Sequence, residues 1–159
     1  MTVATFGAGC FWGVEYFFNE IVGVKQTTCG YMGGNNLASN YKEVKSGNTG
    51  HAEVVQVEYD ETLVSYQDLL EVFWQNHNPT TPNQQGHDIG SQYRSVIFFH
   101  DNQQKIIAEQ SKQALIRSDK WGARQIITEI VPVLKFNRAE EYHQKYLERN
   151  NLPSCHISF

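Results

Sequence analysis

The spacing of apolar residues changes repeatedly along the N-terminal part of the chain, and this constrains the fold more than any other feature. Residues 2–8 and 24–32 have the composition of strands, whereas the apolar residues between Phe11 and Gly23 recur at the spacing of one helical face. The series is completed by a strand over 51–60, a helix over 66–77 and a strand over 93–100. The predicted order is therefore strand, helix, strand, strand, helix, strand.

This order of elements is typical of the split βαβ, or ferredoxin-like, fold, an α+β two-layer sandwich with its helices on one face of a sheet. A C-terminal extension follows, with a helix over 102–118, a strand over 125–133 and a helix over 138–150. The chain of 159 residues is long enough to bury one core, and no linker or repeat divides it. We predict a single domain over 1–159, in which residues 151–159 form a mobile tail.

The net charge and the composition of the chain limit the classes of molecule that it can bind. The net charge is −4 and no arginine precedes Arg94, which disfavours a nucleic-acid binder. No apolar run approaches the length of a membrane span, and the N-terminus lacks the basic segment of a signal peptide. We therefore expect a soluble, cytoplasmic, monomeric protein that binds neither nucleic acid nor a membrane.

Cys10 lies where the first strand gives way to the first helix, within the stretch "GAGCFWGVEYFF". The positive end of a helix dipole favours a thiolate over a thiol, and Gly7 and Gly9 permit a tight turn that a ligand can approach. A free cysteine at a strand end is also commonly a small buried hydrophobe. With three scattered cysteines in a reducing compartment, redox or catalytic use is the stronger interpretation for Cys10.

Several alternative chemistries can be weighed around Cys10. The glycines miss the dinucleotide-binding spacing, and no arginine follows closely enough to clamp a phosphate. The histidines and cysteines also lack the spacing of a metal site, so we expect no metal. A cysteine protease stays open because its base needs only spatial proximity. The candidate bases are His51, His77, His87, His100, His143 and His156.

Two polar segments, "NYKEVKSGNTGHAEVV" and "HNPTTPNQQGHDIGSQYRS", add a second set of motifs. Together with "GCFWG", "GYMGG" and, more loosely, "EEYHQKYL", they resemble the A-class methionine sulfoxide reductases. The resemblance implies a ferredoxin-like α+β core and an enzyme of protein repair under oxidative stress. It implies reduction of the S epimer of methionine sulfoxide, free or in proteins, with thioredoxin as the reductant.

The resemblance also implies roles for individual residues, although each of them has an ordinary structural alternative as a core, surface or turn residue. The family's nucleophile corresponds to Cys10, and its methyl-binding wall corresponds to Phe11 and Trp12. The groups expected around the sulfoxide oxygen are the catalytic carboxyl of Glu53, the hydroxyls of Tyr41 and Tyr93, and the supporting Asp88.

Sulfoxide chemistry requires residues of these types. A thiolate that attacks the sulfur must expel an oxide, which is a poor leaving group unless donors hold and protonate it. Burial among aromatic rings can raise the pKa of a carboxyl such as Glu53 toward neutrality and make it an acid. Release of methionine leaves Cys10 as a sulfenic acid, which condenses with a second thiol.

Cys155 and Cys29 are the candidates for this second, resolving thiol. Cys29 lies within a predicted strand whose ladder holds the backbone in place, whereas Cys155 lies in the terminal segment, which can close over the site at a modest entropic cost. Cys155 also matches a tail cysteine of the family. We predict that Cys155 is the resolver and that Cys29 is a structural thiol.

The chain departs from the family pattern at a few positions. Asn78 and Gln84 stand where aspartate and arginine are common, and Met32 replaces a smaller residue, which we interpret as a packing change. Two other functions stay open: a thiol peroxidase, and a non-enzymatic module that docks oxidised methionine. Turnover of hydrogen peroxide would identify the first, and stoichiometric binding without product would identify the second.

Overall fold

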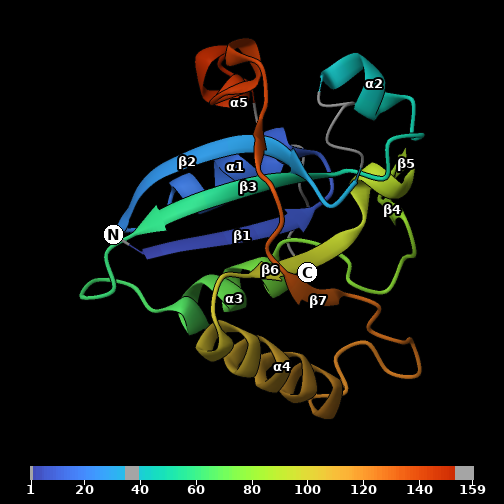
Figure 1. The fold of residues 1–159 in the computed structure, drawn as a ribbon. Coiled ribbons are helices and arrows are strands. Elements are labelled where there is room, and N and C mark those ends of the chain that lie inside the picture. Colours follow the sequence, from blue (N-terminus) through green and yellow to red (C-terminus); the bar gives the residue numbers. More distant parts are fainter. Residues whose placement is uncertain (1, 35–39, 153–159) are drawn as a thin grey trace.

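In the computed structural model, which describes residues 2–34 and 40–152, six strands form one mixed sheet in the order β7-β6-β1-β3-β2-β8 (Figure 1). Every neighbouring pair is antiparallel except β6 and β7, which are parallel. The strands are β1 (Thr2–Ala8), β2 (Val24–Met32), β3 (Ala52–Tyr59), β6 (Ser95–Phe99), β7 (Glu129–Pro132) and β8 (Asn137–Arg138).

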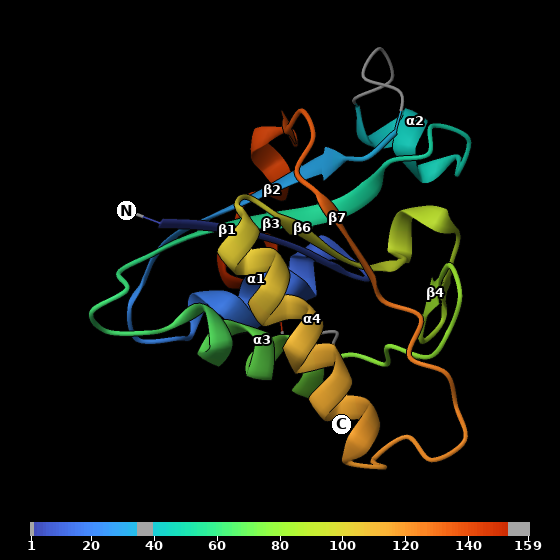
Figure 2. The same ribbon diagram turned by 60° about the horizontal axis from the view of Figure 1, so that its bottom comes forward.

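Three longer helices pack against this sheet and against one another (Figure 2). They are α1 (Phe11–Asn19), α3 (Tyr66–Gln75) and α4 (Asn102–Arg117). The shorter elements are α2 (Tyr41–Lys45), the hairpin of β4 (Gln84–Gln85) and β5 (Asp88–Ile89), 3-10 turns over Ser91–Tyr93 and Glu141–His143, and α5 (Tyr146–Arg149). The α+β class predicted from the sequence is confirmed.

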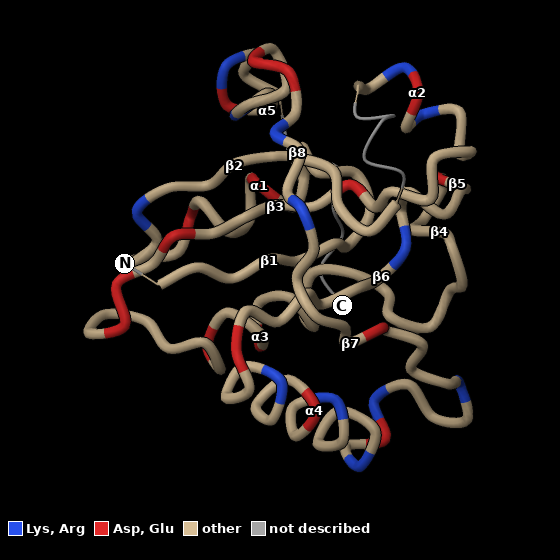
Figure 3. Tube along the Cα trace, in the orientation of Figure 1, with Lys and Arg blue, Asp and Glu red and all other residues tan. Residues whose placement is uncertain are grey.

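The two faces of the sheet differ in what covers them. In β3, Val55 and Val57 belong to the main core, which also contains α1, whereas Val54 packs on the opposite face with Phe98 and Val131. Since side chains alternate along a strand, Glu53 points to the same face as Val55 and α1. Neither β1 nor β6 contains a charged residue, and Figure 3 shows the charges mainly on the helices and connecting segments.

Two predicted elements of the C-terminal extension are wrong in extent. The helix expected over 138–150 is a 3-10 turn over 141–143 and one turn of α5, because Lys145 adopts a left-handed conformation with φ of 54° and interrupts it. The strand expected over 125–133 forms only over Glu129–Pro132, where it pairs with β6. The other predicted strands and helices match within a few residues.

No helix among residues 2–34 and 40–152 is long and apolar enough to cross a bilayer. The expected cytoplasmic location and monomeric state stay predictions from the sequence. The predicted tail over 151–159 lies mostly outside the described residues, as do Cys155 and His156.

Candidate active site

The antiparallel pairing of β1 with two neighbours gathers the candidate residues at one end of the sheet. Ala8 at the end of β1 pairs with Ser95 at the start of β6, and β3 begins beside the same end of β1. Cys10 lies two residues after β1, Glu53 lies at the start of β3, and Tyr93 lies two residues before β6. Residues far apart in the sequence therefore meet at this end of the sheet.

Cys10 is the N-cap residue of α1 and is partly exposed. Its backbone carbonyl accepts hydrogen bonds from the N–H groups of Gly13 at 3.2 Å and Val14 at 3.3 Å, which begins the helix. Gly9 precedes it with φ of 97°, a conformation that few residues other than glycine adopt. The thiol thus lies at the positive end of α1, where a thiolate is favoured.

Glu53 lies directly beside this helix N-terminus. Its side chain is buried, with 1% of the residue exposed, and its Oε1 accepts a hydrogen bond of 3.1 Å from the backbone N–H of Phe11. Because Phe11 directly follows Cys10, this bond holds the Glu53 carboxyl group against the residue next to the one that carries the thiol. Glu53 is therefore not the solvated strand residue that its sequence environment also allowed.

Besides burial, the charges of Glu53 and Cys10 contribute to the raised hydroxyl pKa values of both Tyr41 and Tyr93. Burial, followed by the negative charges of Glu53 and Cys10, raises the pKa of the Tyr41 hydroxyl to about 12. Burial, followed by the charges of Glu53 and Asp88, raises the pKa of Tyr93 as well. Both phenols therefore stay protonated at neutral pH and can donate hydrogen bonds, while Asp88 is exposed at the edge of the cluster.

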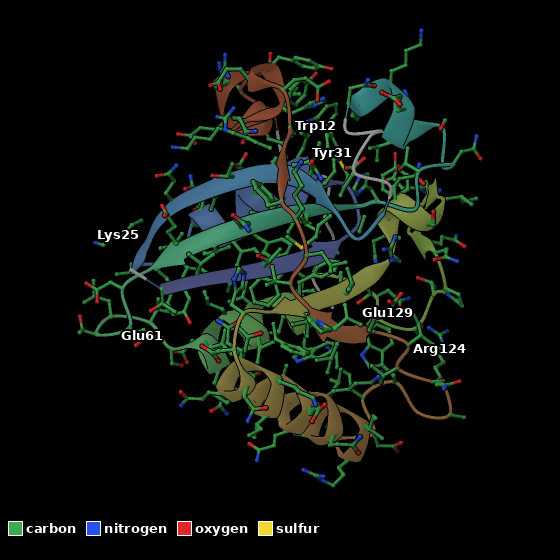
Figure 4. The ribbon with its side chains drawn as sticks, viewed as in Figure 1. Trp12, Lys25, Tyr31, Glu61, Arg124 and Glu129 are labelled. Carbon is green, nitrogen blue, oxygen red and sulfur yellow. The ribbon has the colours of Figure 1, made fainter. Side chains whose placement is uncertain are left out.

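Phe11 and Trp12 form an aromatic wall next to Cys10. The Phe11 ring is fully buried and lies 6.4 Å from the Tyr41 ring between centroids. The Trp12 ring stacks on Tyr146 with centroids 3.8 Å apart and planes inclined by 10°. The indole N–H of Trp12 also donates a 2.9 Å hydrogen bond to Nδ1 of His143. Figure 4 labels Trp12 next to α5, the helix that begins with Tyr146.

Sequence reasoning missed the contribution of the C-terminal segment to this site. Besides His143 and Tyr146, it supplies Glu140, whose carboxylate accepts hydrogen bonds from the Tyr31 hydroxyl at 2.9 Å and the Tyr41 N–H at 3.1 Å. The signal available was the motif "EEYHQKYL", but its periodicity was typical of an ordinary helix. The segment instead departs from helical geometry, and its side chains pack against the aromatic wall of Phe11 and Trp12.

Cys29 is buried deep beneath α1. Its thiol donates to the Glu15 carboxyl at 3.4 Å and to the Phe11 carbonyl at 3.6 Å. Burial, together with the neighbouring charge of Glu15, raises the pKa of the Cys29 thiol well above its ordinary value. This environment favours an unreactive neutral thiol.

Two of the histidines considered as a protease base already have partners of their own. Both ring nitrogens of His77 lie within hydrogen-bonding distance of other groups, the Phe73 carbonyl at 2.6 Å and the Ser95 hydroxyl at 2.7 Å. His143 accepts from Trp12. These bonds favour structural roles for both rings over a role as the base of a cysteine protease.

The three departures from the family pattern lie in ordinary structural settings. The Asn78 side chain accepts hydrogen bonds from the backbone N–H of Thr80 at 2.9 Å and from its hydroxyl at 2.5 Å, as in an Asx turn. Gln84 begins the short hairpin strand β4. Met32 is fully buried and packs with Val54 and Phe98 on the face of the sheet opposite α1, in agreement with its interpretation as a packing change.

Comparison with known proteins links nearly the whole chain to one protein family. A family model described as peptide methionine sulfoxide reductase matches residues 2–159. The peptide methionine sulfoxide reductase MsrA of Methanothermobacter thermautotrophicus is 52% identical over 154 residues, covering 97% of this chain and 90% of that protein.

Two solved structures of Mxr1 from Saccharomyces cerevisiae share the fold. The reduced form has a TM-score of 0.89 and 35% identity, covering 96% of this chain and 87% of that one. Mxr1 in complex with Trx2 has a TM-score of 0.65 and 23% identity, covering 99% and 88% of the two chains.

Proposed function

Because the chain belongs to the peptide methionine sulfoxide reductase family, it is an enzyme that reduces methionine sulfoxide, and we propose that it uses Cys10 as nucleophile and Glu53 as acid on the S epimer. The observation that carries this assignment is the 3.1 Å hydrogen bond between the Phe11 N–H and the buried Glu53 carboxyl. It holds an acid next to a thiol at a helix N-terminus.

In the proposed reductase step, the Cys10 thiolate attacks the sulfur of the sulfoxide. This attack forms a bond between the Cys10 sulfur and the substrate sulfur. The protonated oxygen then transfers to the Cys10 sulfur as the sulfur–oxygen bond and the sulfur–sulfur bond both break, so that Cys10 becomes a sulfenic acid and the substrate sulfur keeps the electron pair and leaves as methionine. Glu53 supplies the proton to the oxygen, and its buried carboxyl is held at the N-terminus of α1 beside Cys10. The hydroxyls of Tyr41 and Tyr93 hold the same oxygen by hydrogen bonds, and Asp88 supports them from the rim.

The aromatic wall selects the substrate in this proposal. Phe11 and Trp12 bind the S-methyl group, so that only one epimer presents its sulfur to Cys10 while its oxygen points at Glu53. The stacking of Trp12 on Tyr146 and its bond to His143 fix the plane of the indole, which supports a selective pocket. Both free and protein-bound methionine sulfoxide are substrates that the family resemblance implies.

Recycling of the sulfenic acid requires a second thiol, and we assign that role to Cys155 in the tail over 151–159. The burial of Cys29 supports this choice, because its thiol is held beneath α1 and its raised pKa disfavours attack. Condensation of the Cys10 sulfenic acid with the Cys155 thiol releases water and forms a disulfide. Thioredoxin then reduces this disulfide, a proposal supported by family membership and by the complex of Mxr1 with Trx2.

We also propose that residues 1–159 form a single domain with a ferredoxin-like core. The strand order β6-β1-β3-β2 supports this description, with every pair antiparallel. The helix between β1 and β2 is α1 and the helix between β3 and β6 is α3, which is the split βαβ order.

The test is turnover of the purified full chain with separated S and R epimers of methionine sulfoxide, and with hydrogen peroxide, under reduction by thioredoxin. We expect methionine from the S epimer alone. Equal use of both epimers would remove the methyl pocket from the account, and faster turnover of peroxide than of sulfoxide would identify a thiol peroxidase instead.

A further inference from the structure

We propose that Gln92 and Glu140 are positioning residues that hold the two ends of α2 and thereby place the Tyr41 hydroxyl beside Glu53. This inference rests on the proposed function, because it matters for catalysis only if Tyr41 binds the sulfoxide oxygen. Neither residue belongs to the set that the sequence motifs pointed to.

The short helix α2 needs support from outside itself. It contains five residues, Tyr41–Lys45, and among them only Val44 is buried. Helices of this length are unstable in isolation, because the free-energy cost of nucleation exceeds the gain from the hydrogen bonds of a single turn. The N-cap residue Asn40 accepts from the backbone N–H of Glu43, which satisfies only one of the unpaired groups at the helix ends. The position of Tyr41 therefore depends on contacts with other segments.

Glu140 holds the first residue of α2. One carboxylate oxygen accepts the backbone N–H of Tyr41 at 3.1 Å, and the other accepts the Tyr31 hydroxyl at 2.9 Å. Tyr31 lies in β2 and is fully buried, so it is a rigid anchor. The carboxylate thus ties the N-terminus of α2 to the central sheet.

Gln92 holds the last residue of α2. Its side-chain Nε2 donates a 3.2 Å hydrogen bond to the backbone carbonyl of Lys45, one of the carbonyls that a helix end leaves without an intrahelical partner. Gln92 is only 4% exposed, although it comes from a connecting segment. A side chain at position 90 would place its Cβ 2.2 Å from the Gln92 amide oxygen, so Gly90 leaves the space that this buried amide occupies.

The same two contacts set the relation between the two phenols. Gln92 immediately precedes Tyr93, and its side-chain amide is hydrogen-bonded to the helix that begins with Tyr41. The Tyr41 ring lies 6.4 Å from the ring of Phe11, whose N–H binds the Glu53 carboxyl at 3.1 Å. Burial, followed by the charge of Glu53, raises the pKa of both hydroxyls. An error of about 1 Å in placing a catalytic group can reduce a rate 100-fold, so loosening α2 would separate the donors from the oxygen that they hold.

The test compares Gln92→Ala with Gln104→Ala as a matched control. Gln104 is also 4% exposed and also donates its Nε2 to a distant backbone carbonyl, that of Val3 at 2.9 Å, but it belongs to α4 and binds β1 rather than α2. Two quantities are measured in the reduced full chain: hydrogen exchange of the peptide covering residues 41–47, and the single-turnover rate of methionine formation.

We expect Gln92→Ala to raise exchange of that peptide and to slow methionine formation about 10- to 100-fold, while Gln104→Ala changes neither. In a Tyr41→Phe background the Gln92 substitution should cost less than about 2-fold, since the hydroxyl that it positions is gone. Gln92→Glu, which keeps the shape but loses the donor, should behave like Gln92→Ala, and Glu140→Ala should raise the same exchange.

Unchanged exchange in Gln92→Ala, or an equal rate loss with and without the Tyr41 hydroxyl, would overturn the proposal. Failure of the proposed function is distinguishable from this result. If the wild-type chain formed no methionine, the reaction assignment would fail, whereas the exchange measurement would still decide whether Gln92 holds α2.

Discussion

The backbone N–H of Phe11 donates a 3.1 Å hydrogen bond to Oε1 of Glu53, although the two residues are 42 positions apart in the chain. The bond joins the first residue of α1 to the start of β3, and Cys10 lies immediately before the donor. It explains why a carboxyl group is buried here at all, since the N-terminus of a helix offers unpaired N–H groups to an acidic side chain.

Glu53→Gln should slow the reductase step by roughly 100-fold or more, the scale expected when a general acid is lost. The amide keeps the size of the side chain and an oxygen that can accept from Phe11, but it has no acidic proton to deliver. The measurement is the rate of methionine formation in a single turnover, and Glu58→Gln on the same strand is the control. A rate equal to that of the wild type would mean that Glu53 is not the acid.

The phenols of Tyr41 and Tyr93 should remain protonated across the physiological range and beyond. Because burial and the charge of Glu53 raise the pKa of Tyr41 to about 12 and raise that of Tyr93, neither hydroxyl loses its proton below pH 10. The single-turnover rate should therefore show no decline attributable to tyrosine ionisation between pH 8 and pH 10.

A matched experiment isolates the hydroxyls themselves. Tyr41→Phe combined with Tyr93→Phe removes both donors while keeping the rings, and we expect a rate loss of roughly 100-fold from the loss of oxygen stabilisation. The double substitution should leave the pH dependence between pH 8 and pH 10 unchanged. An alkaline decline in the wild type that vanishes in the double variant would show that a phenol ionises in that range.

Sequence reasoning worked best where a local pattern and the tertiary environment agree. The strands β1, β2 and β3 follow from their composition. The helix α3 follows from its periodicity, because Tyr66, Leu69, Leu70 and Phe73 form the face that it buries. The residues that converge around Glu53 could be named only through family motifs, since nothing in the spacing of Tyr41 and Tyr93 says that they meet.

The C-terminal segment could not be predicted in the same way. Its helical pattern is overridden by tertiary hydrogen bonds: the Gln144 side chain accepts the Cys29 N–H at 2.8 Å and donates to the Cys29 carbonyl at 3.1 Å. The left-handed conformation of Lys145 then redirects the chain so that Tyr146 stacks on Trp12. Such side-chain contacts with a distant strand leave no periodic signal.

Glu15 should make the stability of the fold depend on pH. Burial raises the pKa of its carboxyl, so the native state binds this proton more tightly than the unfolded chain does. The native state is therefore favoured most at low pH, and that contribution is lost as pH rises from the ordinary value of 4.5 through the raised native pKa. Glu15→Gln, which mimics the neutral acid, should remove this dependence.

Urea unfolding of the reduced protein at several pH values between 4 and 7 measures the effect. The free energy of unfolding of the wild type should fall relative to that of Glu15→Gln as the pH rises, while the exposed Glu20→Gln should follow the wild type. A difference between wild type and Glu15→Gln that stays constant with pH, or changes in the opposite direction, would contradict the assignment.

Cys155→Ser and Cys29→Ser should separate the resolving thiol from the structural one. Without Cys155, the enzyme should still form one equivalent of methionine and accumulate a sulfenic acid that reacts with dimedone, yet it should not turn over with thioredoxin. Cys29→Ser should cycle normally, because its buried thiol takes no part. A Cys10–Cys29 disulfide found by mass mapping of the oxidised wild type would reverse these assignments.

The central claim is that Cys10 itself takes the oxygen from methionine-S-sulfoxide. The most direct measurement is an anaerobic single turnover of the full chain with the S epimer and no external reductant, scoring methionine formed and thiols lost, beside Cys10→Ser. The account predicts about one equivalent of methionine per wild-type chain with the loss of two thiols, and no methionine from Cys10→Ser, whose fold stays intact. Methionine formed by folded Cys10→Ser at a rate near that of the wild type would contradict it.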